Sequence, residues 1–231
     1  MKKITLTALA LCAFAFTQAQ DLKFGVKGGV NFANLNVDYG GVYGNYGGFD
    51  DNYKMKVGFN AGGFVEYKFT DKWAIQPEVL YSLQGSKQKF NDIDGNYDVK
   101  TNLSYINVPV MVKFYPIPKL YAEAGPQVGF LISAKEKYSE KVFVSADSDE
   151  MDDNIDVKDH YKSIDFGFNV GAGYEFTENL FVNLRYNIGL SNIDDTPSTS
   201  EYNYDEDDFY FGGLSLKTKN SVLSLSVGYK F

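Results

Sequence analysis

Apolar and polar residues alternate with a period of two along most of the chain after residue 22. Five segments alternate regularly, and three noisier ones keep the same phase. A period of two places successive side chains on opposite faces of a β-strand. The pattern therefore predicts eight strands, near Lys23–Asn34, Val57–Phe69, Trp73–Gln84, Ser104–Phe114, Leu120–Ser133, Ile164–Phe176, Leu180–Leu190 and Ser221–Phe231.

The connections between these segments alternate between short and long. Three are brief, at residues 70–72, 116–118 and 177–179, and four are long, at about Leu35–Lys56, Gly85–Val99, Ala134–His160 and Ser191–Thr218. Short turns at one end and long polar loops at the other are typical of outer-membrane barrels. Pro77, Pro109 and Pro126 lie inside predicted strands, where proline removes a ladder hydrogen bond, so we expect β-bulges there.

The orientation of the two faces separates a soluble, lipocalin-like barrel from a membrane barrel. The polar face is rich in Gly and Asn as well as charge, whereas a soluble surface would favour Lys, Glu and Thr. The sequence therefore predicts an all-β fold: an eight-stranded antiparallel up-and-down transmembrane β-barrel in the outer membrane, with short periplasmic turns and long extracellular loops.

The first twenty residues have the pattern of a secretory signal peptide. Lys2 and Lys3 precede an apolar run, Ile4–Phe16, which small and polar residues follow. This run is too short for a spanning helix, which needs roughly 20 residues. We expect a signal peptide at 1–20, whose removal takes away Cys12, and an outer-membrane β-barrel domain at 21–231.

The composition excludes several classes of function. Lys and Arg number 22 against 30 Asp and Glu, for a net charge of −8, which argues against nucleic-acid binding. One Cys and one His exclude a disulfide framework and a multi-His metal site. We expect no cofactor, and outer-membrane lipid is the expected surrounding partner.

Charged residues of both signs lie on the polar face of the strands, which would line the barrel interior. Eight strands leave an interior just wide enough for side chains to fill it, and enclosed charges must pair. We predict a lumen charge network with Arg185 as its hub; its members are Lys27, Glu66, Glu78, Lys113, Glu123, Asp165, Glu175 and Arg185. The same residues leave open a narrow gated ion path, or acid–base chemistry by Glu78 and Glu123.

A second candidate for chemistry lies near the rim. His160 adjoins Asp159, with Ser163 nearby, and some outer-membrane hydrolases use a rim His with Ser or Asp. Adjacency in sequence is not triad geometry, however, and a loop His is usually solvated. We expect no catalytic residues and no enzyme.

Two long loops offer binding chemistry. The acidic run Asp147–Asp153 has the hard oxygen ligands that calcium prefers, without the central Gly and closing Glu of an EF-hand, so weak divalent-cation binding stays open. The first loop places aromatic residues among glycines, which suits contact with a protein or glycan partner and equally suits packing between loops; its aromatics are Tyr39, Tyr43, Tyr46, Phe49 and Tyr53.

Several short motifs resemble the PorT-like outer-membrane β-barrel family of Bacteroidota. They are Gln76-Pro77-Glu78, Tyr105-Ile106-Asn107-Val108-Pro109, Gly125-Pro126-Gln127 and Arg185-Tyr186-Asn187, together with a signal peptide ending in Ala-Gln. The resemblance spans nearly the whole mature chain and implies an outer-membrane location. PorT itself is implicated in type IX protein secretion, so the resemblance implies a secretion-associated role as an alternative. Three function classes therefore remain: a non-enzymatic barrel that supports the envelope and presents loops, a secretion-associated component, and a small gated pore or enzyme.

Overall fold

The computed structural model describes residues 22–40, 53–92, 95–138, 154–195 and 215–231. The predicted signal peptide lies outside these residues. The strands are β1 (Leu22–Gly40), β2 (Tyr53–Thr70), β3 (Trp73–Asp92), β4 (Gly95–Ile117), β5 (Leu120–Tyr138), β6 (Ile155–Asp156), β7 (Ile164–Glu175), β8 (Leu180–Gly189) and β9 (Ser215–Lys230). A short 3-10 helix, η4 (Lys158–His160), follows β6. Among the described residues, no helix has the length and apolar character needed to cross a membrane.

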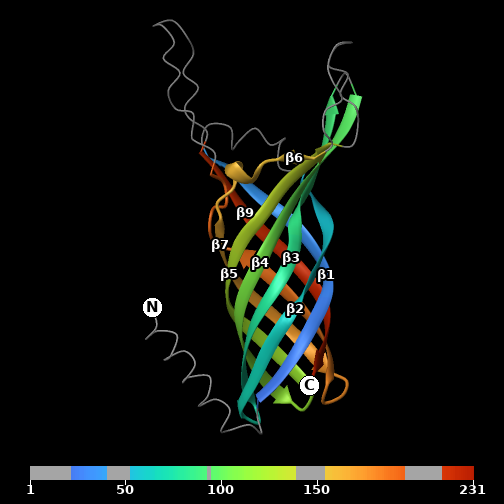
Figure 1. Ribbon diagram of the computed structural model, residues 1–231, viewed down its shortest axis with the longest axis vertical. Coiled ribbons are helices and arrows are strands. Elements are labelled where there is room, and N and C mark those ends of the chain that lie inside the picture. Colours follow the sequence, from blue (N-terminus) through green and yellow to red (C-terminus); the bar gives the residue numbers. More distant parts are fainter. Residues whose placement is uncertain (1–21, 41–52, 93–94, 139–153, 196–214) are drawn as a thin grey trace, which may run out of the picture.

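Eight of these strands form a closed antiparallel ring. Neighbours in the chain pair in order from β1 to β5, β5 continues to β7, and β1 pairs with β9 to close the ring (Figure 1). The two-residue strand β6 lies outside the ring and pairs with β5. Closure leaves no free sheet edge in the ring, as a barrel in lipid requires. The predicted fold class, an eight-stranded up-and-down barrel, is confirmed.

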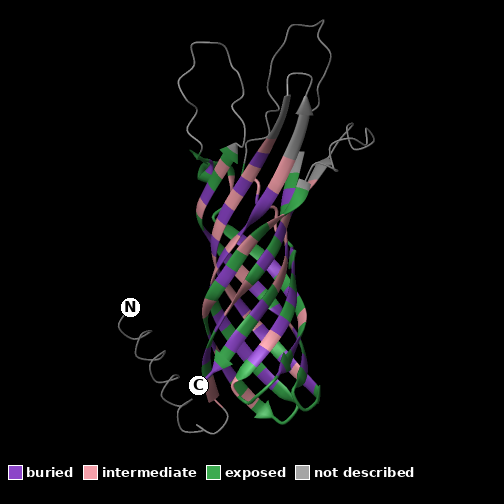
Figure 2. Ribbon diagram, turned by 90° about the vertical axis from the view of Figure 1, so that its right-hand side faces the viewer, coloured by how far each residue is buried: buried purple, intermediate pink, exposed green. Residues whose placement is uncertain are grey.

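The alternating pattern of the sequence becomes two faces of the barrel. Along β7, Phe166, Phe168 and Val170 are exposed, whereas Asp165 and Asn169 between them are buried. Figure 2 shows the same alternation of buried and exposed residues around the whole ring. Because the buried positions are polar and the exposed ones apolar, the apolar face points outward to lipid.

Aromatic side chains gather on the outer face near the short turns. Three ring pairs lie there: Trp73 with Phe114 at 4.7 Å between centroids, Tyr174 with Phe176 at 5.3 Å, and Tyr229 with Phe231 at 5.5 Å. Amphipathic and aromatic rings at this level form the girdle that marks a membrane interface.

The long connection expected at Gly85–Val99 is wrong. The ladder of β3 and β4 continues from Gly85↔Asn102 to Asp92↔Gly95. From Lys89↔Asp98 onward the two strands extend as a hairpin beyond the pairing with β2 and β5 (Figure 1). Gly85 has a φ of 120°, and a Cβ at this position would lie 2.0 Å from the carbonyl oxygen of Thr101. Above the bilayer both faces of a hairpin can meet water, so strand pairing persists where the apolar alternation has ended.

The bulges expected at the three prolines are also wrong. The β3–β4 ladder passes from Pro77↔Val110 to Leu80↔Asn107 in one register, and the pairs Pro109↔Gln127 and Pro126↔Phe168 likewise keep the register of their ladders. Each proline lacks one N–H donor, but the paired residues on both sides of it hold the register. The irregularities of β2 and β3 lie elsewhere, between Met55 and Asn60 and between Lys68 and Thr70.

A cluster of buried apolar side chains lies toward the extracellular end of the barrel. Val157, just before η4, and Ile193 pack with core residues of the ring in a cluster that includes Leu103 and Leu131. Tyr161 packs against this cluster and pairs with Asp194 in an isolated bridge. Burial, helped by the nearby carboxylates of Glu136 and Asp194, raises the pKa of Tyr161 to about 12.

A second apolar layer lies at the end with the short turns. It consists of Phe64, Ala74, Tyr115, Tyr121 and Phe181. Phe64 and Phe181 meet edge to face, with 5.6 Å between ring centroids. The charged part of the interior therefore lies between two apolar clusters.

Replacing Leu184 with arginine tests which face meets lipid. Leu184 lies on the outer face of β8 and is 50% exposed. An arginine in the apolar band should lower the free energy of unfolding by roughly 2–4 kcal/mol, measured by urea unfolding in lipid vesicles.

Ile155→Arg is the matched control, because Ile155 is an exposed aliphatic residue on β6, outside the ring. It should change the same free energy by no more than about 0.5 kcal/mol. Equal losses at the two positions would contradict the assignment of the faces.

Candidate functional site

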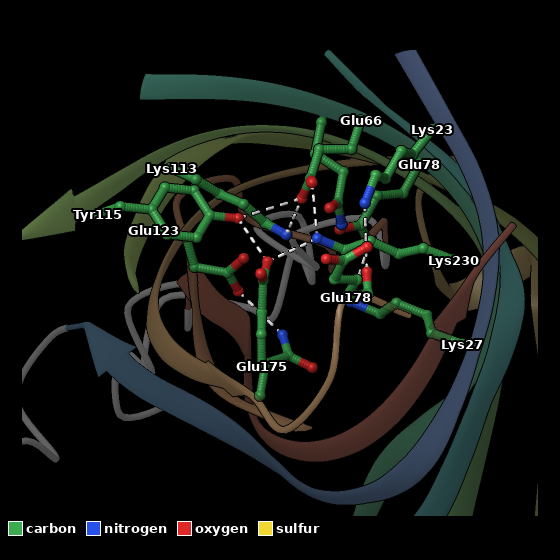
Figure 3. A network of polar contacts seen from close by, with 12 residues as sticks. Lys23, Lys27, Glu66, Glu78, Lys113, Tyr115, Glu123, Glu175, Glu178 and Lys230 are labelled. Atoms are coloured by element: carbon green, nitrogen blue, oxygen red, sulfur yellow. Dashed lines mark hydrogen bonds and ion pairs between the residues drawn. The ribbon is translucent and has the colours of Figure 1, made fainter. Parts of the chain in front are cut away.

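The candidate site is the charged interior near the short-turn end of the barrel. Its side chains come from all eight strands of the ring and converge on the centre, as Figure 3 shows for most of them. The eight residues proposed from the sequence all point inward and are at least nine-tenths buried. Their contacts divide into two groups.

Arg185 lies at the centre of the first group. Its Nη1 and Nη2 donate to the two carboxylate oxygens of Glu78, at 3.0 and 2.8 Å, which makes a bidentate pair. Its Nε donates to Oε1 of Glu123 at 2.8 Å. Lys27 completes the group with an ion pair of 3.0 Å to Glu78. Two cations and two carboxylates thus balance each other.

Neutral side chains occupy further acceptor positions of these carboxylates. The amide of Gln76 donates to Glu78 at 2.7 Å, and that of Asn183 donates to Glu123 at 3.0 Å. A buried carboxylate needs several donors to offset the water it has lost. Glu78 therefore has four donors and Glu123 has two, and all of these donors are side chains of the barrel strands.

The second group lies closer to the short turns. Lys113 and Lys230 donate to the two oxygens of Glu66 at 2.8 and 2.6 Å. Lys230 also donates to Glu175 at 2.6 Å, as does the hydroxyl of Tyr115 at 2.8 Å. This group again contains two cations and two carboxylates.

Aromatic rings connect the second group to the apolar layer beneath it. The Nζ of Lys113 lies 4.3 Å from the ring centroid of Tyr121 and 5.1 Å from that of Phe181. Lys68 lies 4.3 Å from the centroid of Tyr115. A cation over an aromatic face is stabilised by the ring quadrupole, more so where water is excluded.

A layer of amides and hydroxyls fills the lumen farther from the turns. Asn60 donates to Asn31 at 2.7 Å, Asn31 donates to Ser82 at 2.9 Å, and Ser226 donates to Asn60 at 3.1 Å. The interior above the charged groups is therefore also occupied by hydrogen-bonded side chains.

Asp165 is the proposed network residue that lies apart. Its carboxylate accepts from Asn220 at 2.7 Å and from Ser191 at 2.7 Å, near the extracellular end of β7. The sequence predicted that Asp165 faces the interior, but not its height, that is, its position along the barrel axis. This height decides which charges meet.

Two members of the second group were outside the proposed network. Lys230 shares the inward phase of β9, and this phase was the available signal for it. Tyr115 was missed because the sequence reading ended its strand at Phe114, whereas β4 continues to Ile117. Continuing the period of two from Lys113 would have placed Tyr115 on the inner face.

The geometry offers little to a chemical reaction. Glu78 and Glu123 are both held by Arg185, between apolar layers. His160 lies in η4, none of whose residues is buried. In the part of the chain that the structure describes, no group of three His, Cys, Asp or Glu residues could hold a metal ion. The acidic run at 147–153 lies outside that part, as do the side chains of the first-loop aromatics.

A closed eight-stranded ring with an apolar outer face and a polar interior defines the class of protein: a small transmembrane β-barrel of the outer membrane. The chain belongs to the outer membrane protein beta-barrel domain family, which it matches over residues 18–195.

Solved outer-membrane barrels resemble the chain in structure at low sequence identity. Neisserial surface protein A (NspA) is 14% identical to this chain, with a TM-score of 0.48, and the match covers 90% of this chain and 97% of the NspA chain. Ail of Yersinia pestis is 16% identical, with a TM-score of 0.43, and the match covers 92% of this chain and 100% of the Ail chain. OprG of Pseudomonas aeruginosa is 12% identical, with a TM-score of 0.42, and the match covers 90% of this chain and 95% of the OprG chain. No curated protein sequence matches the chain.

Arg185→Ala tests how strongly the first group depends on its hub. The change removes the cation that contacts Glu123 and three of the donors to the two carboxylates. Stranding buried carboxylates should lower the free energy of unfolding by roughly 3–5 kcal/mol, measured by denaturant titration in detergent or lipid.

Lys87→Ala is the matched control, since Lys87 forms a partly exposed ion pair of 2.6 Å with Asp98. Its removal should change the same free energy by about 1 kcal/mol at most. Adding Glu123→Gln to Arg185→Ala should recover part of the loss. If the double variant is no more stable than Arg185→Ala, burial of an unpaired carboxylate is not the cause.

Proposed function

We propose that this protein is a non-enzymatic outer-membrane barrel with a closed lumen, which supports the envelope and carries extracellular loops for binding. The lumen charge network, with Arg185 as its hub, holds the wall strands together across the interior. Each of its two groups contains two cations and two carboxylates, so neither group carries a net charge that would attract an ion.

One observation supports the closed lumen most directly: every cation of the two groups contacts a carboxylate of its own group. Arg185 donates hydrogen bonds from three nitrogens to two carboxylates, and Lys230 bridges Glu66 and Glu175. A gated ion path would need these contacts to break, and each buried carboxylate left unpaired would cost several kcal/mol.

Planar-bilayer recording tests the closed lumen. The wild-type chain should show no steady large conductance, with a general porin as the positive control for the assay.

The double variant Glu78→Ala/Arg185→Ala supplies the internal comparison. It removes one charge of each sign and leaves Lys27 and Glu123 in the first group, so the net charge of the interior is unchanged while side-chain volume is lost. Small, fluctuating currents should appear in this variant alone. Steady conductance from the wild-type chain would overturn the proposal in favour of a pore.

The binding role is assigned to the long connections at 41–52, 139–153 and 196–214. The described strands that flank these segments have the flanking ends opposite the short turns, which is the extracellular end in outer-membrane barrels. A protein or glycan partner and weak divalent-cation binding by the acidic run belong to this proposal. A secretion-associated role, which the PorT-like resemblance implies, would require a protein partner at the same loops.

Replacing residues 139–153 by a short Gly-Ser linker tests the loop role. The replacement leaves every described strand intact, since β5 ends at Tyr138 and β6 begins at Ile155, so the free energy of unfolding should stay within about 0.5 kcal/mol of wild type. Any partner retained from native outer membrane should be lost. A control variant keeps the length of the segment but replaces its carboxylates with amides. Retention of every partner by the linker variant would remove this loop from the proposal.

A further inference from the structure

Four lysines lie directly opposite one another on four neighbouring strands. Lys54 of β2 pairs with Lys87 of β3, Lys87 pairs with Lys100 of β4, and Lys100 pairs with Lys137 of β5. Cross-strand partners project on the same side of a sheet. These residues, here termed the lysine row, therefore form one line of positive charge across the sheet, roughly 14 Å long for four strands.

Such an arrangement is unfavourable for the barrel alone. Like charges directly opposite one another destabilise a sheet, and the row brings three such pairs together. Asp98 offsets one of the four charges through its ion pair with Lys87. The neighbouring Lys135 is outside the row, because its partners in register are Asn102 of β4 and Asp156 of β6. An excess of positive charge in an otherwise acidic chain points to a partner that supplies negative charge.

The row lies just beyond the lipid-facing band. On β2, outward apolar residues extend from Tyr67 to Val57, which is 65% exposed, and a tilted strand needs about 9–11 residues to cross the hydrocarbon core. Lys54 lies three residues beyond Val57, on the side away from the short turns. On β5, the exposed Ile132 precedes Lys137 by five residues. The row is therefore at the level of the headgroups of the outer leaflet.

We propose that the lysine row binds the phosphate groups of outer-leaflet lipid headgroups. Lys54 and Lys137 are exposed and Lys87 and Lys100 half-buried. Ser86 and Thr101, which are next to Lys87 and Lys100 in the chain, are buried, so alternation places the row on the outer face of the sheet. A lipid suits the position better than a free anion, because its acyl chains would lie along the apolar band while its phosphates reach the row. The inference is independent of the closed lumen.

Binding of lipid A, a diphosphorylated glycolipid, to the full chain tests the proposal by native mass spectrometry in a zwitterionic detergent. Wild type should bind lipid A in preference to phosphatidylcholine. Lys100→Gln/Lys137→Gln should weaken lipid A binding by roughly tenfold or more. Lys158→Gln/Lys162→Gln, which neutralises two exposed lysines outside the row, should leave it unchanged.

Three results of this experiment would overturn the proposal. The first is equal loss of lipid A in the two double variants. The second is displacement of lipid A by inorganic phosphate at the same concentration, which would identify a free-anion site. The third is a marked gain in lipid A binding when residues 139–153 are deleted, which would show that this acidic segment is the occupant of the row.

Stability in two bilayers gives an independent readout. In phosphatidylcholine vesicles, Lys100→Gln/Lys137→Gln should be as stable as wild type or more so, since repulsion within the row is relieved. In vesicles that contain lipid A, the order should reverse. The same order of stability in both bilayers would overturn the proposal even if the detergent experiment had supported it.

Discussion

The narrowness of an eight-stranded ring is the constraint on which the rest of this structure depends. Such a ring leaves room for its own side chains and little else, so a charge that points inward has only other inward side chains as partners. Lys113 and Glu78 are almost completely buried and yet each contacts an opposite charge at 3.0 Å or less. Pairing across the lumen is the condition for placing them there at all.

The same constraint explains the use of arginine and lysine. Arg185 is the single arginine among 22 basic residues, and it occupies the position at which two carboxylates must be held in one plane of donors. A guanidinium can do this with a fixed fork, whereas an ammonium is a point charge on a flexible stem. Lys113 and Lys230 suit the second group, because each ammonium contacts a carboxylate and also lies near an aromatic ring. A compact point charge can take such partners from several directions.

The sequence was sufficient for the fold and for the faces, but not for height within the barrel. A period of two depends on nothing beyond the strand itself, so it predicted that Arg185 and Glu78 both point inward. That the two meet, 107 residues apart, depends on the stagger of eight strands around the ring, which no local pattern encodes. Asp165 shares their face and contacts Asn220 and Ser191 instead. The extension of β3 and β4 past Gly85 was missed for a related reason: outside lipid, strand pairing no longer requires an apolar face.

Charge on this barrel is therefore governed by two different rules on its two faces. Inside, each of the two charged groups balances two cations with two carboxylates, and these partners come from the chain itself. Outside, beyond the apolar band, the lysine row accepts three like-charged cross-strand pairs that a self-contained surface would avoid. An arrangement that is unfavourable by itself persists where something else offsets it, and at this height the neighbour of the barrel wall is the lipid headgroup. The membrane thus acts on this protein in two ways, as an apolar solvent for the band and as a source of counter-charge at its edge.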